Sequence, residues 1–292
     1  MTAYETVLLA TDGSDGATAA ADHALSIAAV FDATLHVVAV VPPYEGPDHE
    51  STRDHVQTSM HRRAEAFVET VANRARGRGV DVVSGVESGP VHQTLLDYAE
   101  THDVDLVVAG SHGRGGFAET LFGSTAARIV TGASMPVLVV GGQHVKHPTY
   151  ETILLPTDGS TGADAVVPYA RALAAALDAT VHVLYVVDVG VYDPDLVVDL
   201  IDGFERFGSR VTAEIGARLT EAGVETETAV RRGRPARTIL DYAAEVDADL
   251  VTMGAHGATG LESLLLGSTT ERVLRAAERP VLTVHARSAT VT

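Results

Sequence analysis

Cysteine is absent from the 292-residue chain, and lysine occurs once, as Lys146. Without cysteine, the chain cannot form disulfide bonds, thiolate metal sites or thiol redox centres. No apolar run approaches the ~20 residues that cross a bilayer, and the N-terminus lacks the basic region and apolar stretch of a secretion signal. We therefore expect a cytoplasmic protein without a membrane partner.

Positive charge is scarce as well. The chain has 21 Lys and Arg residues against 39 Asp and Glu, a formal net charge of -18. An acid-rich, lysine-poor composition is typical of halophilic proteins, whose acidic surfaces suit molar salt, and it also fits an ordinary acidic cytosolic protein. Nucleic-acid partners are disfavoured, because proteins that bind the phosphate backbone normally present a basic surface.

A glycine-rich motif, G-x2-G-x9-G-S-T, occurs once in each half of the chain. Each copy has an upstream companion, Thr-Asp-Gly-Ser, at residues 11–14 and 157–160. The length and the repeat predict two domains, residues 1–143 and 149–292, joined by a linker at 144–148. The motif residues are Gly110, Gly113, Gly123, Ser124 and Thr125, then Gly254, Gly257, Gly267, Ser268 and Thr269.

Apolar runs without polar alternation recur between segments of helical length and read as parallel strands covered on both faces. Ser14 and Ser160 are candidate N-caps before alanine-rich helices at 17–29 and 163–176. The pattern predicts an α/β chain of two tandem, flavodoxin-like (Rossmann-like) domains, each with a doubly wound, five-stranded parallel sheet in the order 3-2-1-4-5. Strands are expected at 6–10, 34–41, 80–86, 105–110 and 137–140, and at 152–156, 180–187, 225–231, 249–254 and 281–284.

In this strand order, ligands bind outside the carboxyl ends of the first and fourth strands, where both motifs fall. Gly110 and Gly113 permit positive φ and close backbone approach, so main-chain N–H groups can face phosphate oxygens. Gly123 then precedes a helix whose N-terminus favours an anion. The sequence thus predicts a phosphate-binding crevice in each half, which is not a Walker A loop because no G-K-[ST] occurs.

Several polar residues have two interpretations. Asp12 and Asp158 either bind a ribose hydroxyl or a metal ion, or cap their own loops through backbone N–H groups. His112 and His256 lie in the glycine loops without a visible carboxylate partner, which favours packing or exposure over catalysis. Arginines cluster at 74–78 and 231–237, where we expect pairing with acids, and the second cluster could alternatively recruit an anionic ligand or partner.

These motifs together resemble the universal stress protein family, over nearly all of both halves. The resemblance implies a bound adenine nucleotide (ATP, ADP or AMP), with or without Mg2+. It implies adenine contacts from Val40, Val186, Ala109 and Met253, adenosine contacts from Thr11, Asp12, Thr157 and Asp158, and ribose and phosphate contacts from the glycines and hydroxyls of the motifs. The remaining candidate site residues are Ala10, its counterpart Pro156, and Arg114, whose counterpart is the uncharged Ala258.

Three functions remain open on this basis. The first is a stress-response protein that binds an adenine nucleotide as a signal, without assigned catalytic or metal-binding residues. The second is slow ATP hydrolysis in the same crevice, which lacks a clear water-positioning base. The third is an interaction scaffold with vestigial pockets, in which the fifth strands pair as an intramolecular pseudo-dimer or a homodimer.

Overall fold

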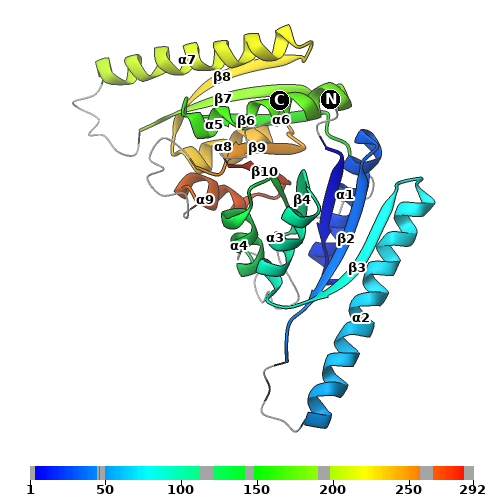
Figure 1. The fold of residues 1–292 in the computed structure, drawn as a ribbon. Coiled ribbons are helices and arrows are strands. Elements are labelled where there is room, and N and C mark those ends of the chain that lie inside the picture. The colour runs from blue at the N-terminus through cyan, green and yellow to red at the C-terminus, as the bar shows by residue number, and fades with distance from the viewer. Residues whose placement is uncertain are drawn as a thin grey trace. The chain divides into compact units, whose positions relative to one another are not determined.

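The computed structural model describes residues 4–44, 46, 50–111, 122–141, 148–189, 198–256 and 266–285. The chain divides into two units, Met1–Pro148 and Thr149–Thr292 (Figure 1). Each unit has a parallel sheet with helices on both of its faces, and the two units are considered separately below. The predicted association of the fifth strands concerns the relation between the units and stays a prediction.

The first unit contains a five-stranded sheet in the order β3-β2-β1-β4-β5, as the sequence predicts. All strand pairs are parallel, and Val7 on β1 lies opposite Leu35 of β2 and Leu106 of β4. Its elements are β1 (Thr6–Ala10), α1 (Asp15–Phe31), β2 (Thr34–Val41), α2 (Glu50–Gly77), β3 (Val82–Ser88), α3 (Val91–Thr101), β4 (Leu106–Gly110), α4 (Ser124–Gly132) and β5 (Val137–Val140).

The second unit has the equivalent order, β8-β7-β6-β9-β10, again with parallel pairs. Its elements are β6 (Thr152–Thr157), α5 (Thr161–Asp164), α6 (Val167–Leu177), β7 (Thr180–Asp188), α7 (Val198–Glu221), β8 (Thr226–Gly233), α8 (Pro235–Glu245), β9 (Leu250–Gly254), α9 (Ser268–Ala276) and β10 (Val281–Val284).

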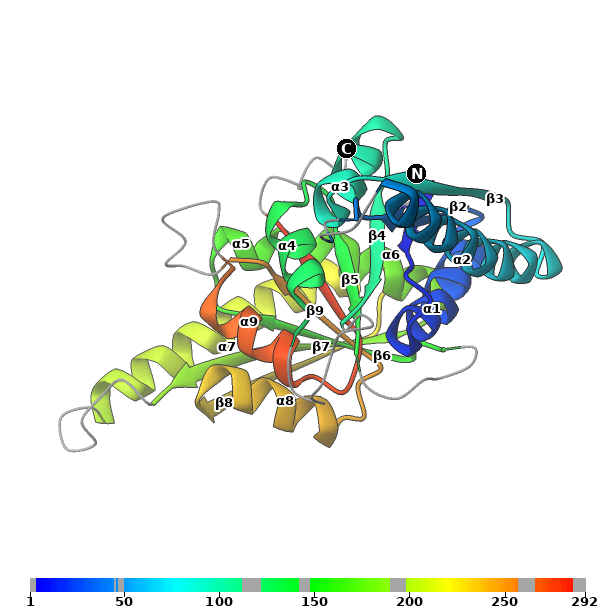
Figure 2. The ribbon, with the colours of Figure 1, turned by 90° about the horizontal axis from the view of Figure 1, so that it is seen from below.

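Helices cover each sheet in the manner expected of right-handed crossovers. In the first unit, α1 and α2 pack on one face of the sheet while α3 and α4 pack together on the other (Figures 1 and 2). In the second unit, α7 packs on β7 and β8, and α8 packs beside α9. The central strands are accordingly buried and apolar, with Leu8, Leu9, Leu154 and Leu155 fully inaccessible to solvent.

Both predicted N-caps are confirmed. The Ser14 side chain accepts a hydrogen bond from the Ala17 amide at 3.1 Å, and Ser160 accepts one from Ala163 at 3.2 Å. The single helix predicted at 163–176 is wrong, however. The segment forms two helices, α5 and α6, and Pro168 stands in the first turn of α6, where a missing N–H does least harm.

The two units differ where Pro156 occupies strand β6. Strand β1 pairs with β4 as far as Ala10, but the recorded β6–β9 register ends at Leu154. Proline has no N–H to donate to a neighbouring strand, which accounts for the shorter pairing. The buried Thr252 hydroxyl donates to the Leu154 carbonyl oxygen at 3.2 Å, so a side chain supplies a hydrogen bond between these strands.

Among the described residues, no helix combines the length and the apolar composition that a membrane crossing requires.

Candidate functional site

The candidate site in each unit lies at the carboxyl ends of the strands, where the sheet changes winding direction. Strands β1 and β4 are neighbours, and the chain leaves them toward opposite faces of the sheet. Strands β6 and β9 have the same relation in the second unit. A crevice at such a point is where open α/β sheets bind ligands.

The Thr-Asp-Gly-Ser loops are held by their own side chains. The Asp12 carboxylate accepts from the Ser14 amide at 2.9 Å, and the Thr11 hydroxyl accepts from the Gly13 amide at 3.3 Å. In the second loop, Asp158 accepts from Ser160 at 3.0 Å and Thr157 accepts from Gly159 at 3.1 Å. The loop-capping interpretation of both aspartates is therefore confirmed; a ligand role stays a prediction.

Gly110 and Gly254 allow two backbones to approach each other. A Cβ atom on Gly254 would lie 2.4 Å from the carbonyl oxygen of Gly162, at the first turn of α5, and Gly110 meets Gly16 of α1 similarly. Gly110 does not use the positive φ that glycine permits, because the described glycines with positive φ are others. Close approach, rather than unusual φ, requires glycine here.

The helix that follows each glycine loop begins without a side-chain cap. The N-cap residues are Gly267 for α9 and Gly123 for α4, and glycine has no side chain that could accept a hydrogen bond from the first N–H groups of the helix. The Gly267 amide bonds the Ala255 carbonyl at 2.9 Å, which returns the chain to the end of β9. The first N–H groups of α9 thus lack a side-chain acceptor at the mouth of the crevice, an arrangement that favours an anion.

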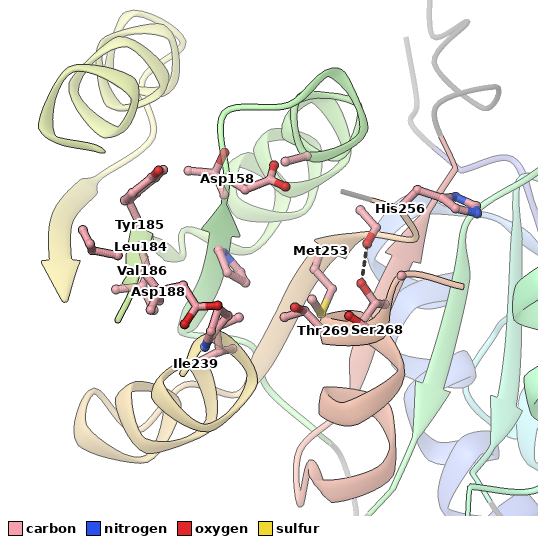
Figure 3. A pocket seen from close by; sticks show the side chains of 18 of the residues that line it. Asp158, Leu184, Tyr185, Val186, Asp188, Ile239, Met253, His256, Ser268 and Thr269 are labelled. Atoms are coloured by element: carbon pink, nitrogen blue, oxygen red, sulfur yellow. Dashed lines mark hydrogen bonds between the residues drawn. The ribbon is translucent and has the colours of Figure 1, made fainter. Parts of the chain in front are cut away.

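A cavity of about 520 Å³ occupies this place in the second unit (Figure 3). Its volume is in the range of sites that hold small molecules. Every second-unit candidate residue that the structure describes lines it: Pro156, Thr157, Asp158, Val186, Met253, Gly254, Gly267, Ser268 and Thr269. Three loop candidates, Gly113, Arg114 and Gly257, lie outside the described residues.

The described first-unit candidates gather at the corresponding edge of their own sheet. Ala10, Val40, Ala109 and Gly110 lie in the last two residues of β1, β2 and β4. Thr11 and Asp12 follow β1 directly, and Gly123, Ser124 and Thr125 form the start of α4. The structure therefore brings the described candidates of the first unit to the carboxyl edge of their sheet, and those of the second unit to one cavity.

The cavity also has walls that the sequence interpretation missed. Tyr185 and Asp188 on β7, Phe204 on α7, and Pro235 and Ile239 on α8 all line it. Asp188 could have been predicted from the sequence. It is the last residue of β7, just as Asp158 directly follows β6, and polar residues at the carboxyl ends of parallel strands lie at the same edge of the sheet. The helical residues carry no local signal, since their position depends on how α7 and α8 pack against the sheet.

The lining is richer in apolar side chains at one end, where Asp188 also lies, and polar at the other. Figure 3 shows Leu184, Val186 and Ile239 near the end of β7, and Ser268 and Thr269 at the start of α9, with Met253 between them. Two carboxylates, Asp158 and Asp188, line the cavity, and its described lining contains neither lysine nor arginine. Within the described residues, no three His, Asp or Glu side chains cluster as metal ligands.

His256 lines the cavity beside a second histidine. Its ring centroid lies 5.0 Å from that of His285, which is buried at the end of β10. The Nε2 atom of His256 is buried without a hydrogen-bond partner in the described structure. His256 therefore packs against His285, in agreement with its interpretation as a packed residue.

The fold defines a tandem, doubly wound α/β protein, and its second unit has a cavity at the switch point of the sheet. The model of the universal stress protein family matches residues 3–141 and again 149–285. The chain therefore belongs to the universal stress protein family, as its motifs indicate.

Known relatives share the tandem length. A universal stress protein of Mycolicibacterium smegmatis is 28% identical over 291 residues, which is 96% of this chain and 97% of the relative. The universal stress protein Rv2005c of Mycobacterium tuberculosis is 30% identical over 295 residues, 94% and 95% of the two chains. The crystal structure of a universal stress protein from Archaeoglobus fulgidus superposes with a TM-score of 0.71 at 23% identity, covering 96% of each chain, a likeness that shows the fold.

Proposed function

We propose that the second-unit cavity binds an adenine nucleotide, ATP, ADP or AMP, and that the bound state serves as a regulatory signal. One observation carries the proposal: a single cavity joins an apolar end at β7 and β9 to the uncapped N-terminus of α9. A planar apolar base with an anionic tail is the kind of ligand that matches such a cavity.

The base fits the apolar end. Val186 and Met253 lie near the carboxyl ends of β7 and β9, the strands on either side of β6, and Ile239 adds a side chain from α8 (Figure 3). Asp158 follows β6 directly as the second residue of the Thr-Asp-Gly-Ser loop, where its carboxylate can accept from a ribose hydroxyl while it also accepts from the Ser160 amide. In this proposal, the ribose lies between the base and the helix N-terminus.

The phosphates fit the other end. The Ser268 and Thr269 hydroxyls and the first N–H groups of α9 can donate to phosphate oxygens, and the helix dipole favours their charge. Phosphoryl transfer additionally requires neutralisation of the charge that develops during the reaction. The described lining supplies two carboxylates and no Lys or Arg, which supports binding over rapid turnover.

Calorimetric titration of the full chain with ATP and Mg2+ tests the proposal, with Ser268→Asp as the decisive variant. An aspartate in the first turn of α9 suits the helix dipole but repels a phosphate group. We expect the parent protein to bind ATP and Ser268→Asp to lose the second-unit site while its thermal unfolding temperature is maintained. Ser124→Asp, the equivalent change at α4, is the matched control and should leave the second-unit site intact.

Two results would contradict the proposal. One is the absence of heat on titration of the folded parent protein with any adenine nucleotide. The other is a Ser268→Asp variant that binds ATP with the parent stoichiometry and affinity.

A further inference from the structure

The second-unit cavity presents an electrostatic problem for the proposed ligand. Asp158 and Asp188 line it, the described lining contains no Lys or Arg, and the chain carries a net charge of -18. A nucleotide phosphate entering this environment is repelled unless a nearby cation offsets the field. The first-unit sequence has Arg114 in its glycine loop, but the counterpart is the uncharged Ala258. A protein cation that adds to the α9 N-terminus in the second site would have to come from another element.

The arginine cluster at 231–237 adjoins the cavity. Gly233 lies opposite Asp188 in the β7–β8 register, and Pro235 itself lines the cavity, so Arg234 stands between two residues that touch or border it. Arg234 is exposed and is the N-cap of α8. Its place in the first unit is taken by Pro90, the N-cap of α3, so this cation is particular to the second unit.

Three of the four arginines in the cluster are already engaged by acids. Arg231 pairs with Glu245 at 3.1 Å, Arg232 with Glu205 at 2.5 Å, and Arg237 with Asp241 at 3.5 Å. Within the part of the chain that the structure describes, the Arg234 guanidinium makes no ion pair. The expectation that the cluster pairs with neighbouring acids is therefore confirmed for Arg231, Arg232 and Arg237. For Arg234, which adjoins the cavity-lining Pro235, no partner lies among the described residues.

We propose that Arg234 is a specificity-determining residue of the second-unit site, which binds the phosphate groups of the nucleotide and makes the site select nucleoside polyphosphates over the uncharged nucleoside. This inference rests on the proposed function. Pro235 and Ser268 line the same cavity, and α8 packs beside α9, so the rim that carries Arg234 and the N-terminus of α9 border one space. A guanidinium donates several charge-assisted hydrogen bonds to a phosphate and remains charged at every relevant pH.

The test is a set of calorimetric titrations with ATP, AMP and adenosine, in the Ser124→Asp background so that the second-unit site is the one observed. Arg234→Gln should weaken ATP binding by about tenfold or more, weaken AMP binding less, and leave adenosine binding unchanged. Arg234→Lys should restore part of the ATP affinity, because it keeps the charge and loses the planar fork.

Arg237→Gln is the matched control. It removes the same charge three residues away, but from an arginine that is paired with Asp241 and is highly exposed. We expect its ATP affinity to stay within about twofold of the background protein. If Arg234→Gln and Arg237→Gln weaken ATP equally, or if Arg234→Gln weakens adenosine as much as ATP, Arg234 is not the specificity residue, although the proposed function stands. If the background protein binds no nucleotide, the proposed function fails and this inference fails with it.

Discussion

A Cβ atom on Gly110 would lie 2.6 Å from the carbonyl carbon of Gly16, so the end of β4 and the first turn of α1 are in backbone contact. This contact places the N-terminal turn of α1, which the Thr-Asp-Gly-Ser loop introduces, directly against the strand that introduces the glycine loop. The Thr-Asp-Gly-Ser loop and the glycine-rich motif are therefore brought together by this backbone contact, which cannot be recognised from either motif alone.

Gly110→Ala should destabilise the first unit by about 1–3 kcal/mol, because a methyl group there forces the backbone of α1 away from the sheet. Gly85→Ala on β3 is the control, since its Cβ would meet no atom within 4 Å. That change should be neutral or stabilise the protein by about 0.5–1 kcal/mol, as expected where alanine replaces glycine in a strand. Denaturant unfolding measures both changes, and equal effects at the two positions would argue against the contact.

The ion pair between Asp22 and Arg74 should contribute strongly to stability. Asp22 is buried on α1, and its carboxylate accepts from Arg74 of α2 and lies 3.7 Å from Arg78. Asp22→Asn leaves two arginines without their anion, and we expect a loss of about 3–5 kcal/mol in the free energy of unfolding.

A similar but exposed pair in the second unit serves as the comparison. Asp164 and Arg218 link α5 to α7 at 2.6 Å, and both side chains are about half exposed. Asp164→Asn should change the free energy of unfolding by at most about 1 kcal/mol. If urea denaturation shows a larger loss of unfolding free energy for Asp164→Asn than for Asp22→Asn, burial does not determine how much these two ion pairs contribute to stability.

The first unit should lose stability on mild acidification because of His36. This buried histidine on β2 is hydrogen-bonded through Nδ1 to the Tyr98 hydroxyl at 3.0 Å, and its ring centroid lies 5.5 Å from that of His102. Burial, and secondarily the neighbouring His102, lower the pKa of His36 from its ordinary value of 6.5. The folded unit then binds fewer protons than the unfolded chain, so this contribution is complete above pH 6.5 and is lost as the pH falls through the lowered pKa.

Thermal unfolding of the full chain between pH 8 and pH 5 checks this expectation. His36→Gln should flatten the part of the pH dependence that His36 supplies. His102→Ala removes one cause of the lowered pKa, so the loss of stability should be smaller. An unchanged pH profile in both variants would rule out His36 as its source.

The N-cap serines should differ in their contribution because they precede helices of different length. Ser14 caps the 17-residue α1, whereas Ser160 caps the four-residue α5. Ser14→Ala should cost about 1 kcal/mol, within the usual range for an N-cap. Ser160→Ala should cost less, because few residues depend on that cap. Parallel denaturation curves for the two variants measure the difference; a reversed order would contradict this argument.

Strand positions and caps could be predicted because their causes are local. Continuous apolar runs such as residues 106–109 require burial on both faces, and Ser14 lies immediately before a helical pattern. The break between α5 and α6 was not predicted, although Pro168 stands in the first turn of α6, a position that proline favours. Val186 and Met253 were assigned to the site by the family resemblance and Ser268 by its motif, while the topological rule for parallel sheets placed both motifs at the carboxyl edge.

The sequence by itself determined the duplicated α/β architecture, the strand order within each unit, the capped loops and the family. These features depend on the hydrophobic pattern, the glycine spacing and the N-cap residues, which are local properties of the sequence. The tertiary structure alone decided the walls of the cavity. Tyr185, Phe204 and Ile239 come from a strand and two helices on opposite faces of the sheet, and only packing brings them to one space. It also decided which acids pair with Arg231, Arg232 and Arg237, since Glu245, Glu205 and Asp241 lie within reach only in the folded chain.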